Sequence, residues 1–175
     1  MEHPEAFSFG FSNRSWDATV EILQAHKIER LVDIRTLPGS RYTPHFNQEN
    51  LVRELPKSGI EYVHLKSLGG LRKRQTDSEI NAGWRNDSFR AYADYMQTAE
   101  FDTSVNELFR LIRQKRTAFA CTEAVFWKCH RQLVSDALLI RGVRVSHIFD
   151  ATKTEPHKLT KFAAVDGVSV SYPGE

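Results

Sequence analysis

The sequence predicts an α/β fold, a three-layer sandwich in which a mainly parallel sheet of about five strands precedes an irregular C-terminal tail. Short apolar runs alternate along the chain with longer segments whose apolar residues recur at helical spacing. This alternation is the pattern of βαβ units. No internal repeat, low-complexity tract or linker interrupts the 175 residues. We therefore expect one α/β domain spanning 1–175.

Five runs of five or six residues, rich in apolar or β-branched side chains, are expected to form the strands. They lie at 7–11, 31–35, 61–65, 117–121 and 143–148. The run at 31–35 lacks the alternation of a half-exposed strand, which is typical of a parallel strand covered on both faces. Beyond Ala151 we expect an irregular tail with one short strand at 168–172.

Five segments carry apolar residues three or four positions apart and are expected to form helices. These residues lie between Trp16 and Leu23, Leu51 and Leu55, Phe89 and Met96, Val105 and Ile112, and Leu133 and Leu138. Residues 12–15 supply turn and cap chemistry before the first helix, Asn47 caps the second, and Gly142 ends the last, at about 129–141. The polar segment 75–87 is expected to be a loop, and loops of this length are often functional lids.

Composition and charge exclude several classes of protein. The net charge of +2 and the pI near 8.6 fall short of the bias typical of nucleic-acid-binding proteins. Two cysteines exclude a disulfide scaffold and a zinc finger made from cysteines alone. No apolar run approaches the ~20 residues of a membrane span, and the N-terminus lacks the pattern of a signal peptide. We expect a cytoplasmic protein without a membrane partner.

Polar or reactive residues follow four of the expected strands, at the carboxyl ends where ligands bind in such folds. In strand order they are Asn13 and Arg14; Asp33 and Arg35; Lys66, Gly69 and Gly70; and Cys121 and Glu123. A single strand followed by such residues would be ordinary, but four strands followed by them predict a binding or catalytic site. The basic, glycine-containing loop 66–74 would suit a phosphate-bearing substrate, and a solvated basic loop is the alternative.

Asp33 lies within the apolar run 31–35, where a buried carboxylate is costly unless it is paired. Arg35 lies two residues further on, and its side chain shares a face of the strand with that of Asp33. One interpretation is therefore a structural ion pair. The other is a general base or a carboxylate that orients substrate.

The junction between the fourth strand and the last helix holds Cys121, Cys129, His130 and Arg131. The positive end of that helix and its cationic neighbours would lower the pKa of Cys129, and free amides there would suit an anion. Three interpretations stay open for the cysteines: catalysis assisted by Glu123 and His130, metal binding with His130, and simple burial. Seven residues separate the cysteines, unlike the C-x₂₋₄-C of structural zinc sites, so we assign no metal ligands and no cofactor.

Nine short motifs occur in order along nearly the whole chain. They are G-F-S-N-R-S (10–15), L-V-D-I-R-T-L-P-G-S-R (31–41), F-N (46–47), G-I-E-Y-V-H-L (59–65), L-G-G (68–70), F-R-A-Y-A-D-Y-M (89–96), C-T-E (121–123), C-H-R (129–131) and H-K-L-T-K-F-A (157–163). This set resembles the family called domain of unknown function 488. The resemblance implies a small cytoplasmic α/β protein of bacterial or archaeal type. It also implies that Asp33, Arg35, Arg41, Gly69, Gly70, Cys121, Glu123, Cys129, His130 and Arg131 occupy motif positions.

Two positions depart from the usual motifs of that family. Phe11 replaces the histidine of G-H-S-N, and Thr122 stands where the family usually has the alanine of C-A-E. If that histidine is a metal ligand or a catalytic base in relatives, this chain lacks the role.

These residues predict an enzyme that acts on a phosphate-containing substrate, a nucleotide or a nucleic acid. The residues expected to bind its anionic groups are Arg35, Arg41, Lys66 and Arg131. The residues expected to supply acid–base or nucleophilic chemistry are Asp33, Glu123, Cys121, Cys129 and His130. Two other classes stay open: a nucleic-acid-binding accessory module without chemistry, and a cysteine-based redox or metal-binding protein. The residues give no indication of the oligomeric state.

Overall fold

Six strands form the central sheet of the computed structural model, which describes residues 3–174. From one edge to the other they are β3 (Glu61–His64), β2 (Arg30–Asp33), β4 (Thr117–Cys121), β1 (Glu5–Gly10), β5 (Arg144–Ile148) and β6 (Thr154–Pro156). The first five run parallel, and β6 pairs antiparallel with β5. The sheet is therefore mainly parallel, as the sequence predicts.

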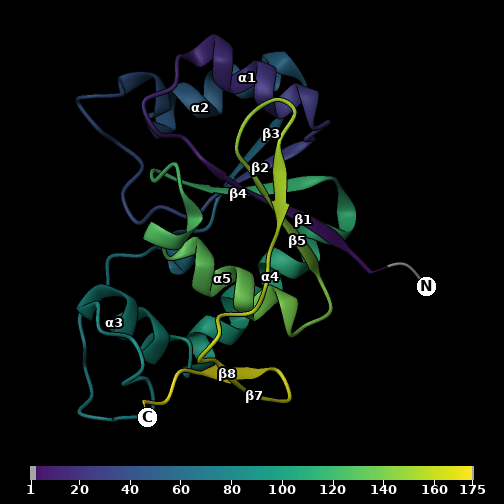
Figure 1. Ribbon diagram of the computed structural model, residues 1–175. Coiled ribbons are helices and arrows are strands. Elements are labelled where there is room, and N and C mark those ends of the chain that lie inside the picture. Colours follow the sequence, from purple (N-terminus) through teal and green to yellow (C-terminus); the bar gives the residue numbers. More distant parts are fainter. Residues whose placement is uncertain (1–2, 175) are drawn as a thin grey trace.

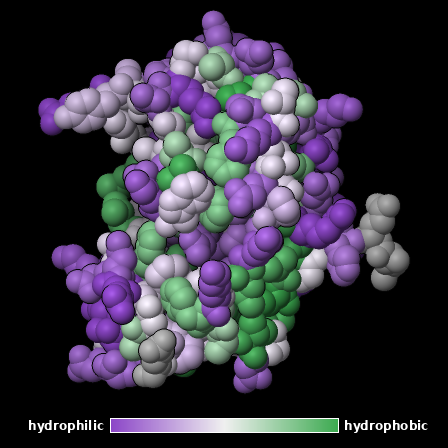
Figure 2. All heavy atoms as spheres, viewed as in Figure 1, coloured by the Kyte–Doolittle hydropathy of each residue, from purple (hydrophilic) through white to green (hydrophobic). Residues whose placement is uncertain are grey.

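Helices cover both faces of the sheet and complete the three layers (Figure 1). One layer holds α1 (Trp16–Ala25) and α2 (Gln48–Glu54), and the other holds α3 (Asp87–Tyr95), α4 (Ala99–Gln114) and α5 (Arg131–Leu139). The 3-10 turns are η1 (Pro44–Phe46), η2 (Leu55–Ser58), η3 (Lys66–Leu68) and η4 (Phe126–Lys128). Hydrophilic residues predominate over the α1–α2 layer in Figure 2, as expected of the outer side of amphipathic helices.

Alternation along β1 divides the core into two clusters. Phe7 and Phe9 pack into the cluster beneath α1 and α2, and Ala6 packs into the cluster beneath α4 and α5, because successive side chains of a strand point to opposite faces. Ser8 shares the face of Ala6, and its hydroxyl meets Arg131 of α5. The face of β1 beneath α5 thus carries small residues, which leave room for a large polar side chain.

The predicted fold class is confirmed, and the strand at 117–121 has the predicted bounds. The tail beyond Ala151 contains more strands than expected: β6 adds a sixth strand to the sheet, and β7 (Ala164–Asp166) pairs with β8 (Ser169–Ser171). All residues of β6 and β7 are exposed. Strands of three exposed residues have no buried face, so no hydrophobic alternation marks them in the sequence.

The carboxyl end of β4 is the topological switch point of the sheet. Its neighbours β2 and β1 are followed by the helices of one layer, whereas β4 leads into α5 in the other layer. Where the connections after neighbouring strands turn to opposite faces of the sheet, they leave a crevice at the strand ends. Ligands of open α/β sheets bind in such a crevice. Cys121 is the last residue of β4.

The segment predicted to be a loop at 75–87 lies between η3 and α3 and contains no helix or strand before α3 begins. Buried Asn81 fixes it, since its amide donates to Asp94 at 2.8 Å and accepts from the Tyr172 amide at 2.9 Å. Trp84 packs against the rings of Phe89, Phe162 and Tyr172. The loop is thereby packed against α3 and the C-terminal tail.

Within residues 3–174, no helix combines the length and the apolar composition needed to cross a lipid bilayer.

Asp136 on α5 fastens the C-terminal tail to the domain. This fully buried carboxylate accepts hydrogen bonds from His157 Nε2 at 2.7 Å, from the hydroxyl of Thr160 at 2.6 Å and from the hydroxyl of Tyr172 at 2.8 Å. Burial raises the pKa of Tyr172, and the nearby carboxylate acts in the same direction. The tyrosine therefore stays a hydrogen-bond donor.

Tyr172→Phe should lower the free energy of unfolding by about 2 kcal/mol, because a buried carboxylate loses one donor. Urea denaturation monitored by circular dichroism measures the change. Tyr42→Phe is the matched control, since Tyr42 is 82% exposed and its change should leave stability unaltered. Equal effects of the two substitutions would show that Asp136 does not hold the tail.

Candidate functional site

A cavity of about 440 Å³ opens at the switch point, beside the end of β4. Its walls come from the segments that follow β2, β3 and β4 and from the start of α3. The lining residues are Arg35, Thr36, Leu37, Gly70, Leu71, Ser88, Phe89, Cys121, Thr122, Glu123, Lys128, Cys129 and His130. Elements far apart in the sequence thus supply one site.

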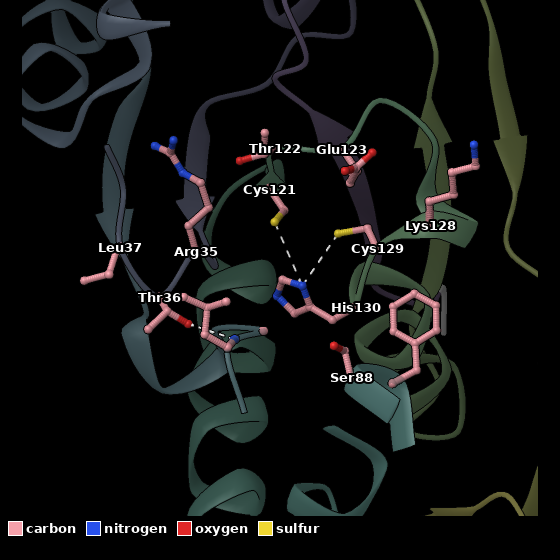
Figure 3. Close-up of a pocket in the computed structure, with 13 residues that line it drawn as sticks. Arg35, Thr36, Leu37, Ser88, Cys121, Thr122, Glu123, Lys128, Cys129 and His130 are labelled. Carbon is pink, nitrogen blue, oxygen red and sulfur yellow. Dashed lines mark hydrogen bonds between the residues drawn. The ribbon is translucent and has the colours of Figure 1, made fainter. Parts of the chain in front are cut away.

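Both cysteines point at one imidazole inside this cavity (Figure 3). Nδ1 of His130 lies 3.6 Å from Sγ of Cys129 and 3.9 Å from Sγ of Cys121. The three atoms all lie within 4.8 Å of one another. Among the described residues, this is the one group of three histidine, cysteine or acidic side chains close enough to share a metal ion.

Two backbone contacts fix the orientation of His130. Its Nε2 lies 3.0 Å from the carbonyl oxygen of Ile34, which can only accept, so Nε2 carries a proton and Nδ1 is the ring nitrogen that faces the two sulfurs. Gly70 lies against the same ring, and a Cβ at that position would come within 2.6 Å of Nδ1. The absence of a side chain at position 70 therefore leaves the imidazole room to face both sulfurs.

The two thiols differ in acidity. Burial opposes ionisation of Cys129, but hydrogen bonds from Cys121 and His130 and the charge of Arg131 hold its pKa well below the ordinary value. The Arg131 amide also donates to Sγ of Cys129 at 3.4 Å. The hydrogen bond to Cys129 and burial raise the pKa of Cys121. Of the two thiols, Cys129 is therefore the more acidic.

Arg131 lies beneath the site and is only 1% exposed. Its guanidinium donates to the Ser8 hydroxyl at 3.3 Å and to the backbone carbonyl of Glu123. Its Nε has no hydrogen-bond partner among the described residues. Arg131 thus ties the loop between the two cysteines to β1, and it faces the protein interior instead of lining the cavity.

Of the predicted site residues, six line the cavity: Arg35, Gly70, Cys121, Glu123, Cys129 and His130. The structure brings both cysteines, the histidine and Glu123 together, as expected for residues around one strand end. Gly70 contacts His130, although the sequence analysis assigned it to close approach of a ligand. Gly69 contacts Thr36 instead, where a Cβ would come within 2.1 Å of the hydroxyl oxygen.

Asp33 lies outside the cavity lining and is fully buried. Its carboxylate accepts from Nε and Nη2 of Arg35 at 2.9 and 2.8 Å, and from the Tyr62 hydroxyl at 2.6 Å. Arg35 also donates to the carbonyl of Phe46 at 2.7 Å, which fastens the loop after β2. This arrangement favours the interpretation of Asp33 as half of a structural ion pair.

The other residues predicted to bind substrate lie elsewhere. Arg14 donates to the carbonyls of Gly10 and Phe149 and so joins two strand ends. Asn13, Arg41 and Lys66 are exposed and lie outside the cavity lining. The sequence shows where polar and basic residues occur but not which way their side chains point. In the sequence, these residues were therefore indistinguishable from those that line the cavity.

Seven lining residues were not predicted. They are Thr36, Leu37, Leu71, Ser88, Phe89, Thr122 and Lys128. Thr36, Leu37 and Thr122 directly follow strands, so the strand-end rule could have found them. Ser88 and Phe89 come from the start of α3, and only the tertiary structure places them there.

Phe11, which departs from the usual family motif, lies in the opposite layer of the core. It is 1% exposed and packs against Phe46, with the Arg35 guanidinium 4.6 Å from its ring centre. Its side chain therefore faces away from the cysteines, and the set of Cys121, Cys129 and His130 is complete without a residue at position 11.

One comparison with known proteins gives a match. The family model described as domain of unknown function DUF488 matches residues 15–138. No curated protein and no solved structure matches the chain. The matched range includes β2 to α5 and therefore both cysteines and His130.

Asp33→Asn should lower the free energy of unfolding by about 3 kcal/mol, because it leaves the Arg35 guanidinium buried without its countercharge. Chemical denaturation measures the loss. Glu107→Gln, in a surface pair with Arg110, is the control and should barely change stability. If both substitutions lower the free energy of unfolding by the same small amount, the ion pair does not hold the loop after β2.

Proposed function

The chain belongs to the DUF488 family, whose description leaves its chemistry open, and we propose that it is a hydrolytic enzyme built on a metal ion held by Cys121, Cys129 and His130. The observation that carries this proposal is the approach of two sulfur atoms to one imidazole nitrogen. Thiolate and imidazole are the ligands that zinc prefers. Zinc is therefore the ion we assign.

The distances favour a shared ion over separate hydrogen bonds. Nδ1 of His130 carries either one lone pair or one proton, so it can form a good hydrogen bond to only one of the two sulfurs. A tetrahedral zinc ion, about 2.3 Å from sulfur and about 2.0 Å from nitrogen, would hold these atoms about 3.5 Å apart. The separations of 3.6 and 3.9 Å are close to that value. Small shifts of Cys121 would complete the geometry.

The surroundings of the three residues resemble those of metal ligands in general. A ligating histidine usually donates its other ring N–H to a carbonyl or a carboxylate, and His130 donates Nε2–H to Ile34. An amide hydrogen bond from Arg131 would likewise stabilise the Cys129 thiolate. Such contacts fix ligand orientation before the ion binds.

Three protein ligands leave the fourth zinc position for water, which is the arrangement of catalytic zinc sites. All three ligands line the cavity, so the open position would face the space available to a substrate. Zinc lowers the pKa of its bound water to about 7 and so supplies hydroxide at neutral pH. This supports hydrolysis as the reaction class.

Glu123 is the residue we assign to proton transfer. It lines the cavity, is exposed, and its side chain is not one of the three metal ligands. Its carboxylate would act as the general base that takes a proton from the attacking water. The same proton would then pass to the leaving group, so that water is the only reactant consumed besides substrate.

We further propose that the substrate carries phosphate, as a nucleotide or a nucleic acid does. Lys128 lies on the cavity rim and would pair with such a group. Leu37, Leu71 and Phe89 supply apolar walls against which a base or another flat group could pack. A non-catalytic nucleic-acid-binding module would use the same rim without turnover, so the activity assay below separates the two.

A dithiol redox protein is the second candidate, and the short distance between the two sulfurs favours it. Both lie within 4.8 Å of each other and of Nδ1 of His130. Thiol–disulfide exchange with a disulfide of a partner molecule, which would be reduced to two thiols, would form a disulfide between Cys121 and Cys129 in place of the metal site. Metal content measured under reducing conditions distinguishes the two proposals.

The purified protein, reduced and dialysed against zinc, should retain about one zinc ion per chain. Cys121→Ala, Cys129→Ala and His130→Ala should each reduce the retained zinc to near zero, because two ligands bind zinc weakly. His3→Ala, an exposed histidine outside the cavity, should retain it. Elemental analysis measures the stoichiometry. A zinc-free wild-type protein with two freely titratable thiols would overturn the metal centre and favour the redox candidate.

Glu123→Gln should lower the rate of hydrolysis by about 100-fold or more while zinc content stays unchanged. The zinc-loaded protein is assayed against a panel of nucleotides, short single strands and a chromogenic phosphodiester. Glu49→Gln, an exposed acid on α2, is the control and should keep full activity. Turnover by Glu123→Gln at the wild-type rate would remove Glu123 from the mechanism. Binding without turnover by the wild-type protein would favour the accessory module.

A further inference from the structure

A buried chain of hydrogen bonds runs from Arg131 to Asp136, away from the cavity. The Ser8 hydroxyl lies 2.5 Å from Nδ1 of His147, Nε2 of His147 lies 2.8 Å from Nδ1 of His157, and Nε2 of His157 lies 2.7 Å from Asp136. Each of the five residues is at most 7% exposed. The sequence analysis found no reason to single out His147 or His157.

The two ends of the chain determine its direction. Asp136 can only accept, so His157 donates Nε2–H to it and accepts at Nδ1 from Nε2–H of His147. Nδ1 of His147 then accepts from the Ser8 hydroxyl, and the oxygen of Ser8 accepts from Arg131. This direction gives every proton of the chain an acceptor. Burial lowers the pKa of His147 to about 2, with His157 and Arg131 acting in the same direction, so this ring is neutral.

The chain thus connects a buried cation to a buried anion that does not touch it. Arg131 makes no ion pair with any described residue. Hydrogen bonds through Ser8 and the two imidazoles connect its guanidinium to the carboxylate of Asp136. A buried charge is costly unless it is paired or hydrogen-bonded. The hydrogen-bonded chain meets that need through three intervening side chains.

The same chain reaches the loop that carries the proposed metal ligands. Arg131 donates its amide to Sγ of Cys129 and its guanidinium to the carbonyl of Glu123, so it touches both ends of that loop. Phe126, in the middle of the loop, stacks on His147 with ring centres 3.6 Å apart and planes 4° from parallel. The loop therefore rests on the chain at three points.

We propose that Ser8, His147, His157 and Asp136 are positioning residues of the metal centre, which hold Arg131 and the loop 122–130 in the conformation that lets Cys121, Cys129 and His130 share an ion. This inference rests on the proposed metal centre. It assigns a functional role to residues that lie outside the cavity and touch neither ion nor substrate. Outer residues that orient metal ligands typically affect metal affinity by about 10- to 100-fold.

Ser8→Ala tests the proposal because it removes one hydroxyl and separates Arg131 from the two histidines. The zinc dissociation constant, measured by competition with a chromophoric chelator, should rise by about tenfold. The absorption spectrum of the cobalt-substituted protein should change as well, because it reports the geometry of the thiolate and imidazole ligands. Asp136→Asn, at the far end of the chain, should act in the same direction.

Ser104→Ala is the matched control. Ser104 is also buried and hydrogen-bonded, to Ser67 and to the carbonyl of Glu100, but it lies on α4 outside the chain. It should lower the melting temperature without altering zinc affinity or the cobalt spectrum. A purely structural role for the chain predicts this same result for Ser8→Ala.

The outcomes separate the two proposals. A wild-type protein that takes up no zinc overturns the metal centre itself. A wild-type protein that binds zinc, together with Ser8→Ala and Asp136→Asn variants whose affinity stays within twofold of it, overturns only the positioning role. If one variant fails to fold, the other still decides the question, because each interrupts the chain at a different link.

Discussion

Arg131 carries a positive charge into the interior of the protein, and the surrounding elements are arranged to accept its hydrogen bonds. The face of β1 beneath α5 bears Ala6 and Ser8, which are small enough to admit a guanidinium. The carbonyl of Glu123 turns inward to meet it, and this sets the path of the chain between β4 and α5. The conformation of the loop that separates the two cysteines therefore depends on one buried side chain.

The elements with a buried apolar face were predictable from the sequence, and those without one were not. The strand ending at Cys121 is a short, largely apolar run, and the helices carry apolar residues at helical spacing, so their predicted positions agree with the structure. The tail strands β6 and β7 are short and exposed, and Asp136, whose burial no local pattern announces, fastens the tail that carries them. The predicted strand at 168–172 corresponds to β8, in which Val170 is buried. Long-range polar contacts of this kind become visible only when the chain is folded.

The candidate site was predictable in its centre and not in its surroundings. The strand-end rule located Cys121, Cys129, His130 and Glu123, because these residues flank a single junction. Spacing argued against a metal, since short C-x₂₋₄-C intervals are typical of compact zinc knuckles. Here a strand end and a helix start bring the two cysteines and His130 together across a longer loop, so the interval along the chain does not measure their separation in space.

The cavity has two unlike sides, a closely packed back marked by glycines and a mouth formed by exposed side chains. At Gly10 an added Cβ would come within 1.9 Å of the Glu123 carbonyl oxygen, and at Gly70 it would meet the His130 ring. Neither glycine has room for a side chain, because Gly10 packs on the Glu123 main chain behind the cavity and Gly70 packs on the His130 ring within it, whereas exposed side chains such as Leu37 and Leu71 form the mouth. Substitutions at the mouth could change which molecules enter while the reactive centre stays intact. In the proposed enzyme, this architecture would separate the choice of substrate from the chemistry performed on it.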